Sequence, residues 1–390
     1  MRLLKDLSAS AVVAGFVTVL VSFTSSAVIV VQAAGTLGAT PAETASWMLA
    51  LGLGMGLTCI GLSLRYRVPV VTAWSTPGAA MLITSASGVA MSDAVGAFLV
   101  SAALITLFGF TGWFERAIRR IPVSLASGML AGVLLRFGLD VYAAMKTQFG
   151  LVFAMFCVYL VARRLQPRYA IVATLAAGVA FAFFHDQLRL AGLSFALAAP
   201  VFTMPTFSTG ALIGIALPLF IVTMGSQNVP GVAVIRASGY QVPVSPLVGW
   251  TGVATLLLAP FGAYALNLAA ITAAISLGRE AHEDPARRYV AAVAAGVFYL
   301  AVGAFGATVS ALFAAFPKEL VLAIAGLALL GTIGNGLAAA LRDDAEREPA
   351  LITFLVTASG VTLFGVGSAF WGLVAGVLAL LVLNARRQPA

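Results

Sequence analysis

A motif near the first quarter of the chain, Trp74-Ser-Thr-Pro-Gly78, has the residue types of a helix start. Ser75 or Thr76 can cap a helix N-terminus, and Pro77 fits the first turn because the N–H that it lacks has no helical partner there. A helix start also has unpaired N–H groups and a partial positive charge. The motif therefore predicts a place that can receive an anion such as a carboxylate.

A second motif, Tyr264-Ala-Leu-Asn267, has a related pattern in the other half of the chain. Here Asn267 can cap the helix, and Leu268 with the apolar residues after it can continue the helix. We expect these two helix starts to hold one ligand between them.

An aromatic residue stands three positions before each proposed start, Trp74 before Pro77 and Tyr264 before Asn267. Flat apolar rings beside an anion site suit an aryl carboxylate, because ring stacking adds about 0.5–1.5 kcal/mol to burial. Packing or interfacial anchoring is the alternative for either residue alone. Their matched offsets favour a role in binding.

Polar side chains interrupt two other apolar runs and could bind a carboxylate from flanking helices. They are Ser22, Thr24, Ser25, Ser26, Gln227 and Asn228. For the serines and the threonine, hydrogen bonding between membrane helices is the leading alternative. Gln227 and Asn228 are costlier to bury without partners, and Gly225 and Pro230 indicate a loosened backbone around them, so we favour a binding role for these two.

Composition decides which elements must position these residues. The chain has 390 residues, of which 61% are hydrophobic and 9% charged, with a mean hydropathy of +1.04. Soluble proteins carry about 25% charged residues. A membrane helix needs roughly 20 apolar residues, so this chain is an all-α polytopic membrane protein and not a soluble enzyme.

The apolar runs predict twelve full spans and two interrupted ones, fourteen segments in all. The full spans are expected at 9–34, 46–64, 94–113, 123–140, 147–163, 169–185, 209–229, 245–260, 286–306, 317–341, 350–365 and 368–385. The interrupted ones are 68–88 and 261–279, each read as a short extended stretch followed by a half-helix.

The basic residues give the orientation of these segments. With the N-terminus in the cytoplasm, 18 of the 22 Lys and Arg residues fall in cytoplasmic loops, as the positive-inside rule requires. Both termini are then expected in the cytoplasm. The net charge of +8 is explained by these clusters and does not indicate a nucleic-acid partner.

The interrupted segments come third in each set of seven. Because seven is odd, the second set must return in the opposite orientation, which gives a 7+7 inverted repeat. Such repeats bind substrates near the midplane at broken helices. The two half-helix starts, in segments 3 and 10, should then point at each other.

No cofactor or metal is expected. Cys59 and Cys157 lie within apolar runs without ligand spacing and are expected to be small buried hydrophobes. No nucleophile and base pair or His/Asp/Glu cluster falls at membrane depth, so an integral membrane enzyme is the least favoured class.

The motif Gly225-Ser-Gln-Asn-Val-Pro-Gly231, followed by Arg236-Ala-Ser-Gly-Tyr240, resembles the benzoate/proton symporter family BenE. The motifs at Trp74 and Tyr264 fit the same family, and the likeness covers essentially the whole chain. It implies uptake of benzoate or a related aromatic carboxylate, together with a proton, across a bacterial inner (plasma) membrane. The family is similar in architecture to uracil and xanthine permeases and to sulfate-type anion carriers.

The resemblance also implies two domains. A core domain would comprise residues 1–115 and 205–305, and a gate domain 116–204 and 306–390. In the similar carriers the gate often lies at a dimer interface, so a homodimer is left open.

This sequence departs from the similar nucleobase carriers at the substrate site. Where those carriers place acidic residues, it offers Gln227, Asn228 and Asn267. A neutral site fits an anionic substrate but leaves proton coupling unexplained. Our hypothesis is that the bound carboxylate itself completes the proton site by sharing a proton with a water or hydroxyl.

Two alternatives remain open at this point. One is a nucleobase or inorganic-anion transporter of the same fold. The other is an anion channel that uses the same helix starts.

Overall fold

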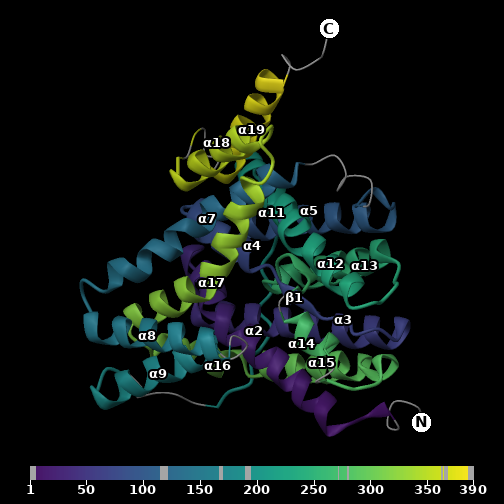
Figure 1. The fold of residues 1–390 in the computed structure, drawn as a ribbon, viewed down its shortest axis with the longest axis vertical. Helices are drawn as coiled ribbons and strands as arrows, with labels where there is room; N and C mark the ends of the chain where they lie inside the picture. The colour runs from purple at the N-terminus through teal and green to yellow at the C-terminus, as the bar shows by residue number, and fades with distance from the viewer. Residues whose placement is uncertain are drawn as a thin grey trace.

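The protein is described by a computed structural model that covers residues 6–114, 122–166, 170–188, 195–270, 272–278, 281–361, 363 and 368–384. In this part of the chain the elements are helices and one two-stranded sheet (Figure 1). Seven helices are long and apolar enough to cross a bilayer, or eight if a bent helix near the N-terminus counts as one span. The expected all-α membrane architecture is therefore confirmed.

The elements follow the predicted order of segments. In the first half they are α2 Ala9–Thr36, α3 Pro41–Tyr66, β1 Thr72–Trp74, α4 Thr76–Ser85, α5 Met91–Phe110, α7 Val123–Ala144, α8 Phe149–Leu165 and α9 Ala170–Phe184. In the second half they are α10 Thr209–Ala211, η2 Leu212–Ala216, α11 Leu217–Val222, η3 Thr223–Asn228, α12 Val229–Ala237, α13 Val244–Leu258, η4 Ala259–Phe261, β2 Leu266–Leu268, α14 Ala273–Leu277, η5 Pro285–Arg287, α15 Tyr289–Ala304, α16 Gly306–Ala314, α17 Lys318–Ala340, α18 Arg347–Ala358 and α19 Ser368–Asn384. Each predicted segment has its counterpart, whereas α16 was not expected as a separate helix.

The two interrupted segments meet in the middle of the molecule. β1 and β2 pair antiparallel, with Ala73 opposite Asn267 and Trp74 opposite Leu266. Two hydrogen bonds extend this ladder, from Ser75 N to Ala265 O at 3.1 Å and from Ala269 N to Val71 O at 2.9 Å. The chain therefore joins the two halves of the repeat through backbone hydrogen bonds.

The half-helix of the second segment begins later than predicted. Asn267 is the central residue of β2 and not a helix cap, and α14 begins at Ala273 after Thr272. The prediction that Leu268 continues a helix was also wrong, because Leu268 pairs with Thr72 of β1. Pairing with β1 keeps the backbone of this stretch extended. The stretch also contains no proline that would start a helix earlier, as Pro77 does after β1.

Corresponding helices of the two halves hold the two strands. In the first half, Thr58 of α3 and Thr72 of β1 share a hydrogen bond of 2.6 Å. In the second half, the Thr255 hydroxyl of α13 accepts from Leu266 N of β2 at 3.1 Å. Since α3 and α13 occupy the second place in each set of seven segments, these contacts follow the inverted repeat.

The first helix of each half is distorted at its polar cluster. In α2, the axes of Ala9–Phe23 and Ser26–Thr36 differ by 41°. In the second half the corresponding stretch, η3, is a π-helix. Bends and π-helical turns of this kind often occur at functional sites because they expose backbone or reorient side chains.

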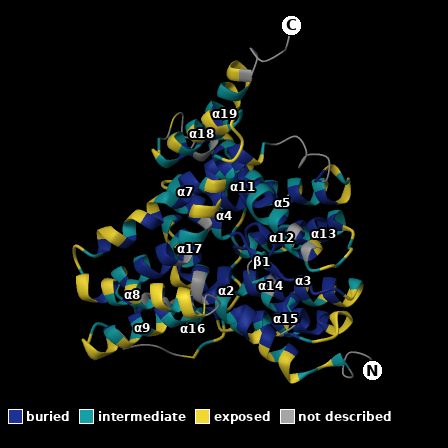
Figure 2. Cartoon of the chain, viewed as in Figure 1, coloured by how far each residue is buried: buried dark blue, intermediate teal, exposed yellow. Residues whose placement is uncertain are grey.

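Helix packing buries the strands deeply. α3 packs against α15, α5 against α13, and α7 against both α17 and α18. Buried residues gather around β1, α3 and α14, whereas exposed residues lie on the outward sides of the helices (Figure 2). Cys59 is buried as expected, but Cys157 is exposed on α8, so the expectation of burial was wrong for Cys157.

Candidate functional site

The start of α4 is built as its sequence predicts. Ser75 is the N-cap, and its Oγ accepts a hydrogen bond from Gly78 N at 3.1 Å. Thr76 and Pro77 form the first turn, and Ala79 N bonds to Ser75 O at 2.9 Å. Because Pro77 has no N–H, the cap and the helix together leave the Thr76 N–H as the first-turn donor still open to a ligand.

Two glycines of the motifs permit close approach between the elements of this site. A Cβ on Gly78 would lie 2.6 Å from Leu219 Cδ1 of α11 and 2.9 Å from Ser75 Oγ. A Cβ on Gly231 would lie 2.7 Å from Leu268 Cβ and 2.8 Å from its carbonyl oxygen. Gly231 therefore requires glycine for a steric reason, because the added Cβ would meet backbone atoms, whereas the close contacts at Gly78 are with side chains.

Asn228 attaches η3 to β2. Its Oδ1 accepts from Leu268 N at 2.9 Å, and its Nδ2 donates to Met224 Sδ at 3.3 Å. The side chain is fully buried. Its hydrogen-bonding capacity is thus largely used within the protein, which makes it a residue that positions β2.

Asn267 is also fully buried, but its amide is only partly satisfied. Nδ2 donates to Ala265 O at 3.2 Å, whereas Oδ1 has no hydrogen-bond partner among the described residues. Strand alternation places Asn267 and Ala73 on one face of the sheet, with Trp74 and Leu266 on the other. Asn267 therefore presents an open acceptor on the face away from Trp74.

The two aromatic residues of the motifs belong to separate clusters. Trp74 Nε1 donates to Ser26 Oγ at 2.9 Å, and the Trp74 ring meets Phe23 edge-on at 4.8 Å between centroids. Tyr264 instead packs between Trp47 and Phe98, at 5.8 and 5.9 Å. Both rings are buried. Because they pack in separate clusters, they do not form the two walls of one binding space.

The remaining predicted residues lie on α2 and η3. Ser22 is buried next to Tyr299, and Ser26 donates to Ser22 O while it accepts from Trp74. Gln227 is partly buried, and the described residues give its amide no hydrogen-bond partner. The side chains of Thr24 and Ser25 lie outside the described part of the structure.

Three features of this region were missed from the sequence. The hydroxyls of Thr223 and Ser226, both in η3, are buried without a partner among the described residues. Ala265 has a φ of +37°, which is rare and costly for a residue with a Cβ. Ser226 could have been found, since it stands beside Gln227 in the same motif, whereas the backbone of Ala265 leaves no signal in the sequence.

The site is electrically neutral. None of the side chains from α2, β1, α4, η3 and β2 named above is ionised at neutral pH. The described residues also contain no group of three or more His, Cys, Asp or Glu side chains that could hold a metal ion. The region therefore offers hydrogen bonds and apolar surface to a ligand.

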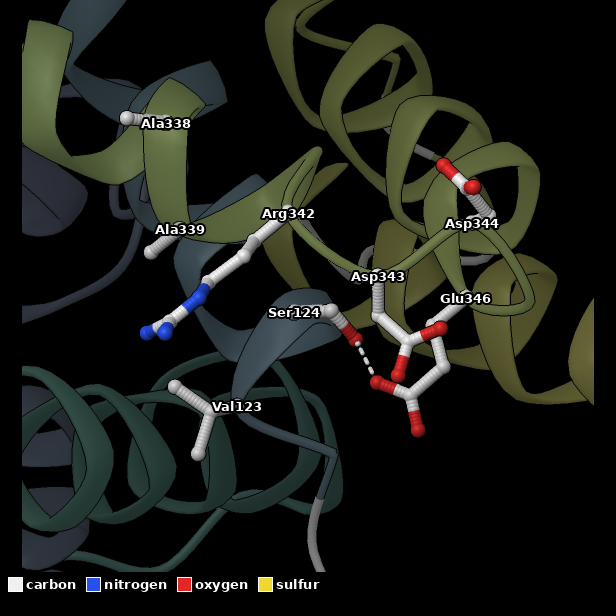
Figure 3. A pocket seen from close by; sticks show the side chains of 8 residues that line it. All are labelled: Val123, Ser124, Ala338, Ala339, Arg342, Asp343, Asp344 and Glu346. Carbon is white, nitrogen blue, oxygen red and sulfur yellow. Dashed lines mark hydrogen bonds between the residues drawn. The ribbon is translucent and has the colours of Figure 1, made fainter.

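A hollow of about 870 Å³ lies elsewhere, where α7 and α18 begin and α17 ends (Figure 3). Its lining is Val123, Ser124, Ala338, Ala339, Arg342, Asp343, Asp344 and Glu346. Ser124 Oγ donates to Glu346 Oε2 at 2.7 Å, while the Arg342 side chain points away from both Asp343 and Glu346 (Figure 3). This hollow contains none of the predicted site residues.

Solved structures of anion transporters share the fold. The chain matches SLC26A9 with a TM-score of 0.63 and 12% identity, covering 95% of this chain and 65% of that one. It matches the transmembrane domain of the cyanobacterial bicarbonate transporter BicA with a TM-score of 0.56 and 10% identity, covering 95% and 97%. These similarities support the inverted-repeat architecture predicted from the sequence.

Sequence comparison identifies much nearer relatives. The chain is 49% identical to the inner membrane protein YdcO of Escherichia coli over 371 residues, which cover 95% of each protein. It is 42% identical to the benzoate membrane transport protein of Acinetobacter baylyi over 379 residues, which cover 97% of this chain and 96% of that protein. The family described as BenE, benzoate membrane transport protein, matches residues 5–382. The chain is therefore a multi-pass inner-membrane protein that belongs to the BenE family of membrane transporters.

Proposed function

We propose that this protein imports benzoate or a related aromatic carboxylic acid, together with a proton, across the inner membrane. Membership in the BenE family and the similarity to the benzoate membrane transport protein of Acinetobacter baylyi support the substrate class. The single observation that supports the location of the substrate site is the pairing of β1 with β2. This pairing brings the capped start of α4 beside the open acceptor of Asn267, in a buried and neutral region.

The carboxyl end of the substrate is assigned to the polar groups around the two strands. Thr76 N–H and the Gln227 amide can donate to it, and Asn267 faces it from β2. Trp74 lies on the opposite face of the strands from Asn267 and bonds to Ser26, so its proposed role is to hold β1, and with it the start of α4, in place. Tyr264, which is held between Trp47 and Phe98, has the proposed role of fixing the start of β2.

Movement between two domains is the proposed way in which access alternates. In this account residues 1–115 and 205–305 carry the site, and residues 116–204 and 306–390 form the gate. The two parts touch where η3 faces α7, since a Cβ on Gly225 would lie 3.3 Å from Ala126 Cβ. A small residue at this contact lets the two surfaces slide past each other in an elevator-like or rocking motion.

Uptake of radiolabelled benzoate into proteoliposomes tests this function. We expect saturable uptake that is inhibited by substituted benzoates but not by uracil or sulfate. Inhibition by uracil or sulfate alone would instead favour a nucleobase or inorganic-anion carrier. Non-saturable flux that never accumulates substrate against its gradient would favour a channel.

Two variants test the location of the site. We expect Asn267→Ala and Trp74→Ala each to lower benzoate affinity at least about tenfold, which corresponds to about 1.4 kcal/mol. Unchanged melting temperatures in detergent would show that both variants remain folded. Wild-type affinity in both folded variants would contradict the assignment.

A further inference from the structure

We infer that the site takes its ligand as the neutral, protonated carboxylic acid, with the acid O–H donating a hydrogen bond to Oδ1 of Asn267. This inference rests on the proposed function and adds which protonation state is bound and where the proton lies. In this form the substrate carries its own proton across the membrane.

The orientation of the Asn267 amide is fixed by its neighbour. Ala265 O can only accept a hydrogen bond, so the side-chain atom 3.2 Å from it must be the donor Nδ2. The same carbonyl also accepts from Ser75 N at 3.1 Å, which holds it in place. Oδ1 is therefore the amide atom that no described residue pairs with, and it is a pure acceptor.

An acceptor in this position selects for a donor. Leaving a buried acceptor unpaired is unfavourable, and a ligand O–H or N–H that bonds to it would recover that free energy. An ionised carboxylate has only acceptor oxygens and would face Oδ1 unfavourably, whereas a protonated acid has one O–H donor. Its carbonyl oxygen can still accept from the Thr76 N–H at the start of α4.

The helix starts and the charges around the strands also favour the neutral acid. The start of α4 is already capped by Ser75, and α14 is only five residues long and begins six residues after Asn267. Among the described side chains named at the strands, none carries a positive charge that would hold an anion. Burial without a countercharge favours the neutral form of a carboxyl group and can raise its pKa by several units.

The protons balance without a protein group. A carboxylate gains a proton from the outer solution, which forms the O–H bond, and loses it to the inner solution, which breaks that bond. One proton thus crosses with each substrate molecule. No side chain of the protein changes its protonation state over the cycle.

Calorimetric titration of the purified full-length protein with three ligands tests the inference. Because a benzoate-like acid has a pKa near 4, the neutral fraction falls about tenfold for each pH unit, so the Kd for total benzoate should rise about 100-fold between roughly pH 6 and 8. Benzamide is a neutral isostere with an N–H donor, and it should bind with a Kd that does not change with pH. Benzenesulfonate, a permanent anion, should not bind measurably.

Two variants locate the acceptor. Asn267→Leu removes Oδ1 at similar volume and should weaken benzamide binding at least about tenfold. Ser85→Ala is the control, since it removes a polar atom, the Ser85 hydroxyl, that also has no partner among the described residues. Ser85 lies at the far end of α4, roughly 14 Å along the helix from its start, so the variant should change neither affinity nor pH slope. If Asn267→Leu does not fold, the three-ligand comparison on the wild-type protein still decides.

The outcomes separate the two proposals. A flat pH dependence for benzoate, with benzenesulfonate binding and benzamide failing to bind, would overturn the neutral-acid inference and leave benzoate transport intact. A pH slope shared by benzamide would place the proton on the protein and also overturn the inference. Failure of all three ligands at every pH would overturn the proposed function itself.

Discussion

The Oδ1 atom of Asn228 accepts a hydrogen bond from the backbone N–H of Leu268 at 2.9 Å. One side chain of a π-helical turn thereby holds the strand of the broken segment, forty positions later in the chain. The inverted counterpart in the first half is the bond from Trp74 Nε1 to Ser26 Oγ, which joins the bent helix α2 to β1. Both polar clusters thus position the strands that form the site.

Removing the Asn228 amide should destabilise the protein. In Asn228→Ala the buried Leu268 N–H loses its acceptor, which we expect to cost about 1–3 kcal/mol and to lower the melting temperature. Thermal unfolding in detergent measures this. Gln227→Ala is the matched comparison, because Gln227 is partly buried and has no hydrogen-bond partner in the described part of the chain. The melting temperature of this variant should change much less.

Losing the helix cap of α4 should lower the stability of the protein by a smaller amount, and the loss should depend on the Ser75 hydroxyl. Ser75→Ala leaves Gly78 N without its acceptor and should cost about 0.5–2 kcal/mol of stability. Ser75→Thr keeps a capping oxygen and should retain most of the stability that the cap provides. Equal stability of the two variants would contradict the capping role that the geometry assigns to Ser75.

The close approach of α12 to β2 gives a steric prediction. Gly231→Ala places a Cβ within 2.8 Å of the Leu268 carbonyl oxygen, so the backbone must shift, and we expect a loss of about 1–3 kcal/mol. Gly35→Ala is the control in α2, because nothing lies within 4 Å of its added Cβ. Its melting temperature should be unchanged or slightly higher, since alanine favours the helix.

Tyr240, in the loop between α12 and α13, gives a pH prediction. Its hydroxyl donates to Pro285 O at 2.8 Å, and burial, opposed by Arg288, raises its pKa above the ordinary value. A raised pKa means that the folded state favours the neutral phenol, so this contribution to stability is present below about pH 10 and is lost as the pH rises further. Tyr240→Phe should flatten the alkaline fall in melting temperature between roughly pH 9 and 11. An identical alkaline fall in the variant would exclude Tyr240 as its source.

Much of the fold was accessible from the sequence because the membrane requires long apolar runs. The interruption at Trp74–Gly78 was also readable, since Ser75 and Pro77 determine a helix start through local chemistry. Local signals failed at Asn267. Its extended conformation comes from pairing with Ala73, nearly two hundred positions away, and no nearby residue encodes that contact.

The same limit applies to the site. The sequence identified the polar residues of η3 and β2 but could not say which of their atoms are already used. Asn228 and Asn267 look equivalent as buried amides, yet one is paired with Leu268 and the other keeps an open acceptor. That difference arises from three-dimensional placement, and it changes the proposed roles of the two residues.

The central claim, transport of an aromatic acid together with its proton, is tested most directly by benzoate accumulation in proteoliposomes with an imposed pH gradient and a pH-sensitive dye inside. An acidic exterior should drive internal benzoate above its external concentration, with about one proton entering per benzoate, and protein-free liposomes should give the background. Benzoate entry through the protein that neither accumulates with the gradient nor acidifies the interior beyond that background would contradict the account.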